Sequence, residues 1–235
     1  MINTEFSNQF DVLYNNVMSN AAPGLNEYEK SVFLTKAQNE LVKNYFNPKG
    51  NKFQEGFDDS AKRQIDFSEL ITTKKINRVV AGTTYDKRGK LYDLSTEKIM
   101  FIIQESIDTN NGTFQVIPIR YDEYMRLMSK PYKEPLKWQA WRIITDSSSK
   151  AELIAHSKDT ISSYTIRYVR FPKPIVLVDL ETEYGDLSID GVSTVSECEL
   201  NEILHEEILQ RAVELAKAAY IGDINSTVQM GQRSE

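Results

Sequence analysis

The spacing of apolar residues changes twice along the chain, and this change limits the fold more than any other feature of the sequence. In the first 70 residues, apolar side chains recur every three or four positions, as on one face of an α-helix. From about residue 72 they alternate or run continuously over short stretches rich in β-branched and aromatic residues, which is typical of strands. After residue 195 the helical spacing returns. This order predicts an α+β fold with N-terminal helices, a β-rich middle and a long C-terminal helix.

The N-terminal region predicts two helices. The first has an apolar face and ends at Ala22-Pro23-Gly24. The second begins after Asn26, whose side chain can cap the helix while the carboxylate of Glu29 bonds back to the Asn26 backbone, and it ends at Asn47-Pro48-Lys49-Gly50. The helical pattern of residues 58–70 is weaker.

The middle of the chain predicts several strands. Residues 98–107 and 113–119 form the clearest pair, because Asn110-Asn111-Gly112 lies between them and Asn-Gly tolerates the positive φ angles of a two-residue hairpin turn. The patterning also predicts a turn at 146–149, a short helix over 122–128 and strands over 138–145, 152–155, 164–171 and 175–180. The last run is continuously apolar, as in a strand buried on both faces. We expect an antiparallel sheet, a sandwich or a barrel-like structure.

The end of the chain predicts a helix that packs back on the rest. Ser196 and Glu199 form a capping-box pattern, and Gly222 is placed to end the helix. The apolar face of this helix is wider than one stripe, which favours burial against more than one neighbour. We therefore expect a helical region over 1–71, a β-rich region over 72–195, a closing helix over 196–222 that shares one domain with the first helices, and a flexible tail over 223–235.

Composition excludes several classes of protein. The 235 residues are 40% hydrophobic and 26% charged, as in ordinary globular chains. The formal net charge of −6 disfavours a general nucleic-acid binder, and one cysteine excludes an internal disulfide and a thiolate zinc cage. The first twenty residues contain no Lys or Arg, unlike a signal peptide, and no apolar run approaches the length of about 20 residues that spans a bilayer. We expect a soluble protein made in a cytoplasm, with no membrane partner.

Charge is distributed unevenly. Residues 1–150 carry 21 basic and 19 acidic side chains (+2), whereas residues 151–235 carry 7 and 15 (−8). Between Pro174 and Gln210 there is no Lys or Arg, and ten acidic residues occur: Asp179, Glu181, Glu183, Asp186, Asp190, Glu197, Glu199, Glu202, Glu206 and Glu207. Basic residues concentrate in another stretch, residues 74–90, in which Asp86 is the only acidic residue. They are Lys74, Lys75, Arg78, Lys87, Arg88 and Lys90.

Two interpretations of these charges remain open. They can be two solvated faces that keep a monomer soluble. Alternatively, the acidic end of one copy meets the basic end of another copy or partner, and head-to-tail contacts of that kind close into rings. An acidic surface lining a channel would also let DNA pass, because repulsion removes the phosphate contacts that hold it.

No sequence motif marks an active site. Walker, G-x-G-x-x-G, G-x-S-x-G, H-E-x-x-H and C-x-x-C patterns are absent, and nothing near His156, His205 or Cys198 supports a catalytic pairing. Glu199, Glu202 and His205 have metal-ligand spacing on a helix but lack the second motif of a di-iron site. We expect no enzymatic activity, no cofactor and no metal ion.

Three further groups of residues are candidates for binding a ligand or a partner. Asp179, Glu181 and Glu183 alternate, so on a strand they would share one face and could bind Ca²⁺, although a calcium loop is missing. Trp138 and Trp141 can form a sugar-stacking face or act as core or interface anchors.

Basic and aromatic residues interleave near residue 170, as in single-strand binders, but the acidic surroundings favour subunit contact. The candidate interface residues are Lys74, Lys75, Arg78, Lys87, Arg88, Trp138, Trp141, Arg167, Tyr168, Arg170, Asp179, Glu181, Glu183, Glu206 and Glu207.

Three segments carry a pattern that composition and periodicity do not explain: residues 25–38 in the second predicted helix, residues 167–177 with the pattern RY-x-R-x-PKPI-x-L, and residues 204–216 in the closing helix. These segments resemble small virion structural proteins of crAss-like tailed bacteriophages. The resemblance implies a ring protein of the phage neck or tail, between the portal and the tail. It carries over no catalytic residue.

The same resemblance implies the partners. They are the chain itself in a ring of about twelve copies, the portal protein and the adjacent neck or tail ring proteins, with DNA only as passing cargo. The ring would be part of the virion and would join head to tail. Two alternatives stay open: a tail or baseplate module that binds host-surface glycan or receptor near Trp138 and Trp141, and a hydrolase with a carboxylate site around Glu202.

Overall fold

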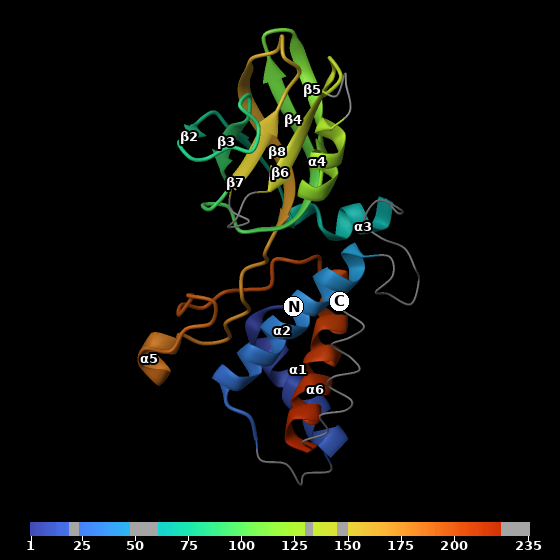
Figure 1. Cartoon of the computed structure of the whole chain (residues 1–235). Helices are drawn as coiled ribbons and strands as arrows, with labels where there is room; N and C mark the ends of the chain where they lie inside the picture. Colours follow the sequence, from blue (N-terminus) through green and yellow to red (C-terminus); the bar gives the residue numbers. More distant parts are fainter. Residues whose placement is uncertain (19–23, 48–60, 130–133, 145–149, 222–235) are drawn as a thin grey trace. The chain divides into compact units, whose positions relative to one another are not determined.

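The structure is a computed structural model that describes residues 1–18, 24–47, 61–129, 134–144 and 150–221 (Figure 1). Two compact units divide the chain. The helical unit comprises residues 1–70 and 172–235, and the sheet unit comprises residues 71–171. Helices at both ends and a strand-rich middle confirm the α+β class.

The helical unit is built on three helices that lie side by side: α1 (Asn3–Met18), α2 (Glu27–Phe46) and α6 (His205–Ile221) (Figure 1). The predicted capping box is present, because the Asn26 side chain accepts a hydrogen bond from the Glu29 backbone and the Glu29 carboxylate accepts one from the Asn26 backbone. Fully buried residues from the three helices include Phe6, Phe10, Leu34, Ile208 and Ala212. The weak pattern of residues 58–70 corresponds to α3 (Ala61–Asp66) and the 3₁₀ turn η2 (Ser68–Leu70).

A buried lysine joins the first two helices. Lys30 of α2 is only 3% exposed, and its ammonium lies 2.7 Å from Asp11 of α1 and 2.9 Å from Glu27. It also donates to the hydroxyl of Ser7, 3.1 Å away. These three partners offset the cost of removing the ammonium from water.

The apolar run at 175–180 predicts a strand, and this prediction is wrong. The segment is extended, but in the described residues it forms only one bridge, between Val176 and Ser196. Its backbone is instead bonded by polar side chains one or two turns apart on α2. Ser31 accepts from the Leu177 amide at 3.0 Å, Thr35 accepts from the Ile175 amide at 3.1 Å, and Gln38 donates to the Lys173 carbonyl at 2.9 Å. Full burial therefore does not require a sheet here.

The closing helix also begins later than its capping-box pattern predicts. Ser196 bonds through its backbone to Val176, and the Glu199 carboxylate accepts from the backbone of Lys173 at 3.1 Å. The helix starts with the 3₁₀ turn η3 (Glu202–Leu204), which the side chain of Asn201 caps, and continues as α6. Gly222 and the expected tail lie outside the described residues.

The described part of the sheet unit forms one sheet of eight strands in the order β1-β8-β4-β5-β6-β7-β3-β2. The strands are β1 (Ile71–Ile76), β2 (Val79–Val80), β3 (Lys90–Asp93), β4 (Ile99–Thr109), β5 (Gly112–Pro118), β6 (Gln139–Ile144), β7 (Lys150–Ile154) and β8 (Ile161–Arg170). Because only Asn77-Arg78 separates the two edge strands β1 and β2, the sheet curls until its edges approach each other, as a half-barrel.

One pair of neighbouring strands departs from the antiparallel expectation. β5 and β6 are parallel, whereas the other neighbouring pairs of the sheet are antiparallel. The helix α4 (Tyr121–Met128) lies in the connection between them, as a parallel pair requires a crossover (Figure 1). The sheet is therefore mixed.

The hairpin of β4 and β5 is confirmed, but its turn differs from the prediction. Thr109 pairs with Gly112, so the turn residues are Asn110 and Asn111. Among the described residues, the only non-glycine with positive φ is Asp190, so Asn111 does not adopt the expected conformation. Gly112, the first residue of β5, has a φ of 133°. The predicted turn at 146–149 lies outside the described residues.

The concave face of the sheet holds both a hydrophobic core and a buried ion pair. Apolar side chains of this core include Ile107, Val116, Ala140, Leu153 and Ile166. Beside them, Arg142 of β6 lies 2.7 Å from Glu105 of β4, and both side chains are less than a tenth exposed. The hydroxyl of Tyr164 donates to the same carboxylate. Three strands are thus joined by charged groups whose bonding needs are met internally.

Candidate assembly surfaces

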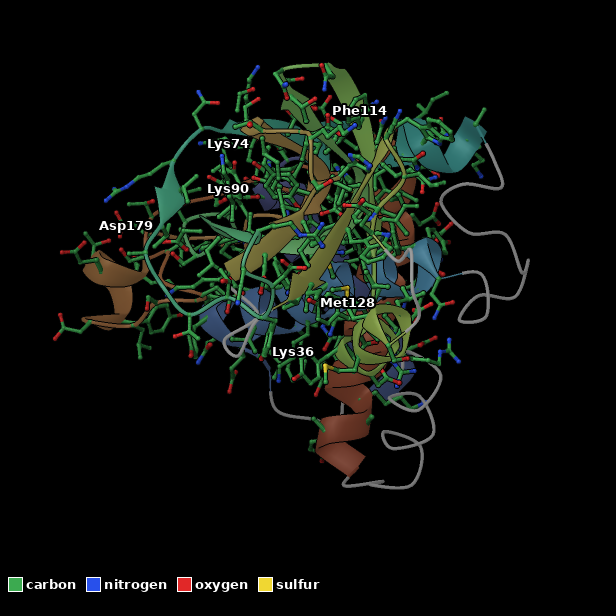
Figure 2. The ribbon with its side chains drawn as sticks, turned by 45° about the horizontal axis from the view of Figure 1, so that its top comes forward. Lys36, Lys74, Lys90, Phe114, Met128 and Asp179 are labelled. Atoms are coloured by element: carbon green, nitrogen blue, oxygen red, sulfur yellow. The ribbon has the colours of Figure 1, made fainter. Side chains whose placement is uncertain are left out.

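The basic residues of the predicted interface begin on the edge strand β1. Lys74 pairs across the strands with the core residue Ile166, whereas Lys75 pairs with Thr165, so the two lysines point to opposite faces of the sheet. Lys74 lies 3.1 Å from Glu97, and both lysines are more than half exposed. Together with Arg78 they line a surface hollow of about 380 Å³ between the edge strands. Lys74 is labelled in Figure 2.

Lys75 forms the best-defined ion pair of this edge. Its ammonium lies 2.7 Å from Asp108, which also accepts hydrogen bonds from the hydroxyls of Ser163 and Thr113. The hydrogen bond from Lys75 and those from the two hydroxyls hold the pKa of Asp108 well below its usual range. Part of the basic charge is therefore already balanced within the chain.

The charge of Arg88 is paired with carboxylates of the same chain. Its guanidinium bonds to Asp86 at 3.0 Å and to Glu134 at 2.8 Å, and about a third of the side chain is exposed. Burial alone would raise the pKa of Asp86, but hydrogen bonds from Arg88 and from the Tyr124 hydroxyl outweigh it and lower that pKa. The neighbouring Lys87 is exposed.

A buried carboxylate fixes the loop that carries these basic residues. Glu152 of β7 has no exposed surface, and it accepts hydrogen bonds from the backbone amides of Tyr85 and Asp86 at 2.9 Å. A Cβ atom on Gly89 would lie 2.1 Å from the Glu152 carboxylate, so only glycine fits at that position. The loop is thus a fixed part of the surface, held from inside the sheet unit.

The basic and aromatic residues of β8 do not form one binding face. Arg167 is exposed, whereas Tyr168 is 3% exposed and lies on the opposite face of the strand. The Tyr168 hydroxyl donates to Glu97 at 2.5 Å, and burial together with this hydrogen bond raises the pKa of Tyr168 to about 12. Arg170 is partly buried. The stacking arrangement of a single-strand binder is therefore not assembled here.

The two tryptophans also have different surroundings. Trp141 packs against Tyr124, Ile143 and Ile154. Trp138, by contrast, is 62% exposed. A paired tryptophan platform for a sugar ring is not present, and Trp138 alone is open to a partner.

The acidic residues at 179–183 lie on a short helix, so their predicted arrangement on a strand is wrong. Asp179 caps the helix α5 (Leu180–Tyr184) by accepting a hydrogen bond from the Glu181 amide at 3.1 Å. Glu181 and Glu183 are exposed, and residues two positions apart in a helix do not face each other. The described residues contain no group of three or more His, Cys, Asp and Glu side chains that could hold a metal ion.

The residues of the acidic surface of the helical unit occur from Asp179, the N-cap of α5 labelled in Figure 2, to the start of α6. Glu206 and Glu207 are both exposed, and Glu207 accepts a hydrogen bond from the Tyr45 hydroxyl of α2. The exposed acidic side chains of this surface are Glu181, Glu183, Asp186, Asp190, Glu197, Glu202, Glu206 and Glu207.

We define the acidic face as these residues together with three exposed aliphatic side chains among them. Leu187 is 39% exposed, Val195 is 55% exposed and Ile203 is 65% exposed. The segment that carries them, from Pro174 to Gln210, contains no basic residue. A surface of this kind combines apolar contact area with charge of a single sign.

The helix α4 presents an apolar surface that the sequence patterns do not identify. Tyr121, Met125 and Met128 follow one another at helical spacing and are 48%, 56% and 40% exposed, while Tyr124 on the other side is buried. The spacing itself predicts an amphipathic helix, but it does not indicate which side faces the protein. An apolar stripe that faces water marks a contact surface.

The cysteine and the histidine of the helical unit are placed for packing. Cys198 donates to the side-chain oxygen of Gln38 at 3.6 Å, and burial raises the pKa of its thiol to about 11. His205 is 4% exposed, bonds to the Leu200 carbonyl at 2.9 Å and lies against the ring of Phe6. A thiol with a raised pKa is a poor nucleophile. In the part of the chain described here, no helix is long and apolar enough to span a membrane.

Charged and apolar surfaces of this extent define a class of protein that acts through contacts with other proteins. The chain belongs to the crAss-like phage tail ring protein family, because the family model "Phage tail ring protein 3/4" matches residues 1–228. It is 63% identical over 235 residues to "Ring protein 4/5" of Bacteroides phage crAss001, covering 98% of each chain.

A second relative of the same phage is more distant. The chain is 34% identical over 224 residues to "Ring protein 3" of crAss001, covering 92% of this chain and 95% of the relative. These matches confirm the resemblance to crAss-like virion proteins. The chain is a structural protein of a phage tail ring and a component of the virion.

Proposed function

We propose that copies of this chain close a homo-oligomeric ring in the neck or tail of the virion, between portal and tail. The ring joins head to tail and surrounds the path of the DNA. The family match and the high identity to a named ring protein support the ring, and the absence of catalytic motifs from the sequence supports a role without turnover. The observation that carries the proposal is the exposed apolar stripe of α4, because such a surface needs a partner.

The proposed mechanism is geometric. Exposed apolar side chains are buried between neighbouring subunits, and charged surfaces select the ring above or below. Complementary charge determines orientation and association rate more than affinity, so it suits the choice between similar rings. The neighbours in the stack are the portal protein and other ring proteins, and the ring holds about twelve copies, which matches the symmetry of a portal.

Carboxylates of the helical unit that lie outside the contacts between subunits suit a wall beside moving DNA. They repel phosphates, so DNA that passes along them meets no basic contact that would hold it. DNA is then cargo and not a ligand, and the purified ring is expected to bind duplex DNA no better than bovine serum albumin does at the same salt concentration.

Mass measurement under native conditions tests the proposal. The purified chain, alone and with a portal protein, is expected to give a closed oligomer of one fixed size. A chain that stays monomeric both alone and with the portal would contradict the proposed ring.

A further inference from the structure

Exposed apolar residues of the sheet unit concentrate around α4. Nine large hydrophobic residues of residues 71–171 are strongly exposed in the described structure. All except Val79 and Phe171 lie on α4, at Tyr85, whose ring packs on Tyr121, or on the part of the chain that follows α4 up to the end of β6. We define the α4 face as these seven residues: Tyr85, Tyr121, Met125, Met128, Leu136, Trp138 and Ile144.

Contacts connect three members of the α4 face. The ring of Tyr85 lies 4.5 Å from the ring of Tyr121, and Tyr121 and Ile144 line one hollow of about 530 Å³. The helix α4 connects the parallel strands β5 and β6 (Figure 1), so its C-terminal end at Met128 leads back toward the start of β6, which Trp138 directly precedes in the chain. The face therefore follows the full length of the helix.

The size of the α4 face matches a stable protein interface. Seven large side chains that are about half exposed leave roughly 500 Å² of apolar surface open to water. A standard interface covers about 800 Å² on each partner, and a little more than half of that is apolar. The α4 face thus supplies the whole apolar part of one side of such an interface.

The acidic face has the properties expected of the surface that binds the α4 face. Its aliphatic residues Leu187, Val195 and Ile203 offer apolar contact, and its carboxylates need a surface with accessible cations. The α4 face is bordered by Arg120 and Arg126, with side chains 84% and 73% exposed, and by the exposed Lys137.

Local acids do not remove this complementarity. Asp122 lies 3.2 Å from Arg120, and Glu123 lies 4.0 Å from Arg126. Such exposed pairs are weak and exchange readily with other partners. The cations of the α4 face therefore remain available to the carboxylates of a neighbouring copy.

We propose that the α4 face of one copy docks on the acidic face of the next copy, which makes these two surfaces the lateral contact of the ring. This assignment rests on the proposed ring function. A ring needs two different surfaces on each subunit that fit one another head to tail, and here the two surfaces lie on different units of the chain. Methionine suits such a contact because its flexible side chain adapts to the partner.

Two sets of variants test the contact. Met125→Asp with Met128→Asp places carboxylates on the α4 face, and Ile203→Asp places one on the acidic face. All three side chains are exposed, so the fold is expected to persist, which far-ultraviolet circular dichroism checks. Each variant alone is expected to weaken self-association at least about tenfold and to give monomers in native mass spectrometry. Val12→Asp, a 60% exposed residue of α1, is the matched control and is expected to assemble like the wild type.

The decisive measurement is a mixture of the two variants. Each retains one intact surface, so an equimolar mixture is expected to form mixed dimers and no closed ring. A double variant of α4 that assembles like the wild type overturns the proposed contact while the ring function stands. Mixed dimers that fail to form, or Ile203→Asp copies that dimerise by themselves, overturn the pairing of the two faces. A wild-type chain that never self-associates overturns both the contact and the ring.

Discussion

Lys30 shows how a single charged residue defines the packing of two helices. Its ammonium is buried, but its partners Asp11 and Glu27 are 47% and 31% exposed. Sequence patterns place Lys30 on α2 without indicating its burial, because a lysine in a helix is usually solvated. The contact depends on Asp11 of a different helix, and a pairing of that kind is not visible in the spacing of either helix.

Replacing Lys30 by methionine is expected to lower the free energy of unfolding by about 1–3 kcal/mol, since two carboxylates lose their partner but remain accessible to water. Urea denaturation followed by circular dichroism measures the loss. Lys36→Met is the matched control, because Lys36 is an exposed lysine of the same helix, and its effect is expected to stay within about 0.5 kcal/mol. Equal losses for both variants would show that the buried ammonium is not the cause.

His205 makes the helical unit sensitive to acid. Burial lowers its pKa below 6.5, and the amino group of Met1, 2.8 Å from Nδ1, disfavours protonation further. Because the folded pKa is the lower one, the unfolded chain binds a proton first as the pH falls, so stability that is present above pH 6.5 is lost as the pH falls towards the folded pKa.

The variant His205→Gln is expected to remove this part of the pH dependence. The free energy of unfolding of wild type and variant, measured from pH 8 to pH 5, is expected to converge as the pH falls, with the wild type showing the steeper decline. Parallel curves for the two proteins would show that His205 does not titrate on unfolding.

At the scale of elements, long periodic segments are predictable and irregular ones are not. The spacing of apolar residues predicts α1, α2, α4 and the strands β4 to β8, and the structure contains all of them. It does not predict β1, β2 and β3, because β1 and β3 carry polar residues, β2 has only two residues, and β1 depends on a partner far along the chain, β8. It assigns 175–180 to a strand because an apolar run looks the same against a helix as within a sheet.

The turn at Asp190-Gly191 illustrates a missed local signal. Both residues have positive φ, 50° and 83°, and Ile189 and Val192 exchange backbone hydrogen bonds across them. This is the conformation that Asn-Gly predicts at residues 110–112, where the structure does not adopt it. The dipeptide pattern was therefore informative, but at another position of the chain.

The attachment of the extended segment to α2 gives the test at this scale. Thr35→Val keeps the shape of the side chain but leaves the buried Ile175 amide without its acceptor, which is expected to cost about 1–3 kcal/mol. Hydrogen exchange is expected to show faster exchange of the Ile175 amide, with little change at the Leu177 amide, which Ser31 still binds. Thr194→Val, at an exposed position, serves as the control and is expected to leave both amides protected. Unchanged exchange at Ile175 would mean that Thr35 does not hold the segment.

At the scale of the whole molecule, the structure changes the electrostatic argument that the sequence suggests. Sequence alone places Lys74, Lys75 and Arg88 in one basic stretch, but the fold points the two lysines to opposite faces and pairs Arg88 with two carboxylates. What is left for a partner is the edge strand β1 and the hollow beside Arg78. Charge counts along a sequence cannot show this, because the acids that neutralise the stretch come from distant positions such as Asp108.

Reversal of Lys74, Lys75 and Arg78 to glutamate is expected to weaken ring stacking and leave the subunit folded. The two lysines that leave internal ion pairs are more than half exposed, so each pair contributes at most about 1 kcal/mol and folding tolerates the change. Contact with an acidic surface of an adjoining ring would become repulsive. Stacking of the wild-type rings is expected to weaken with added salt, because salt screens the attraction between the basic and acidic surfaces.

Electron microscopy of particles assembled with either the wild-type or the variant chain counts the stacked rings. Replacement of the same three residues by glutamine separates loss of attraction from repulsion, since it should give an intermediate defect. Normal stacking of the glutamate variant would mean that the edge of the sheet is an outer surface, and that the order of the rings is determined by apolar contact alone.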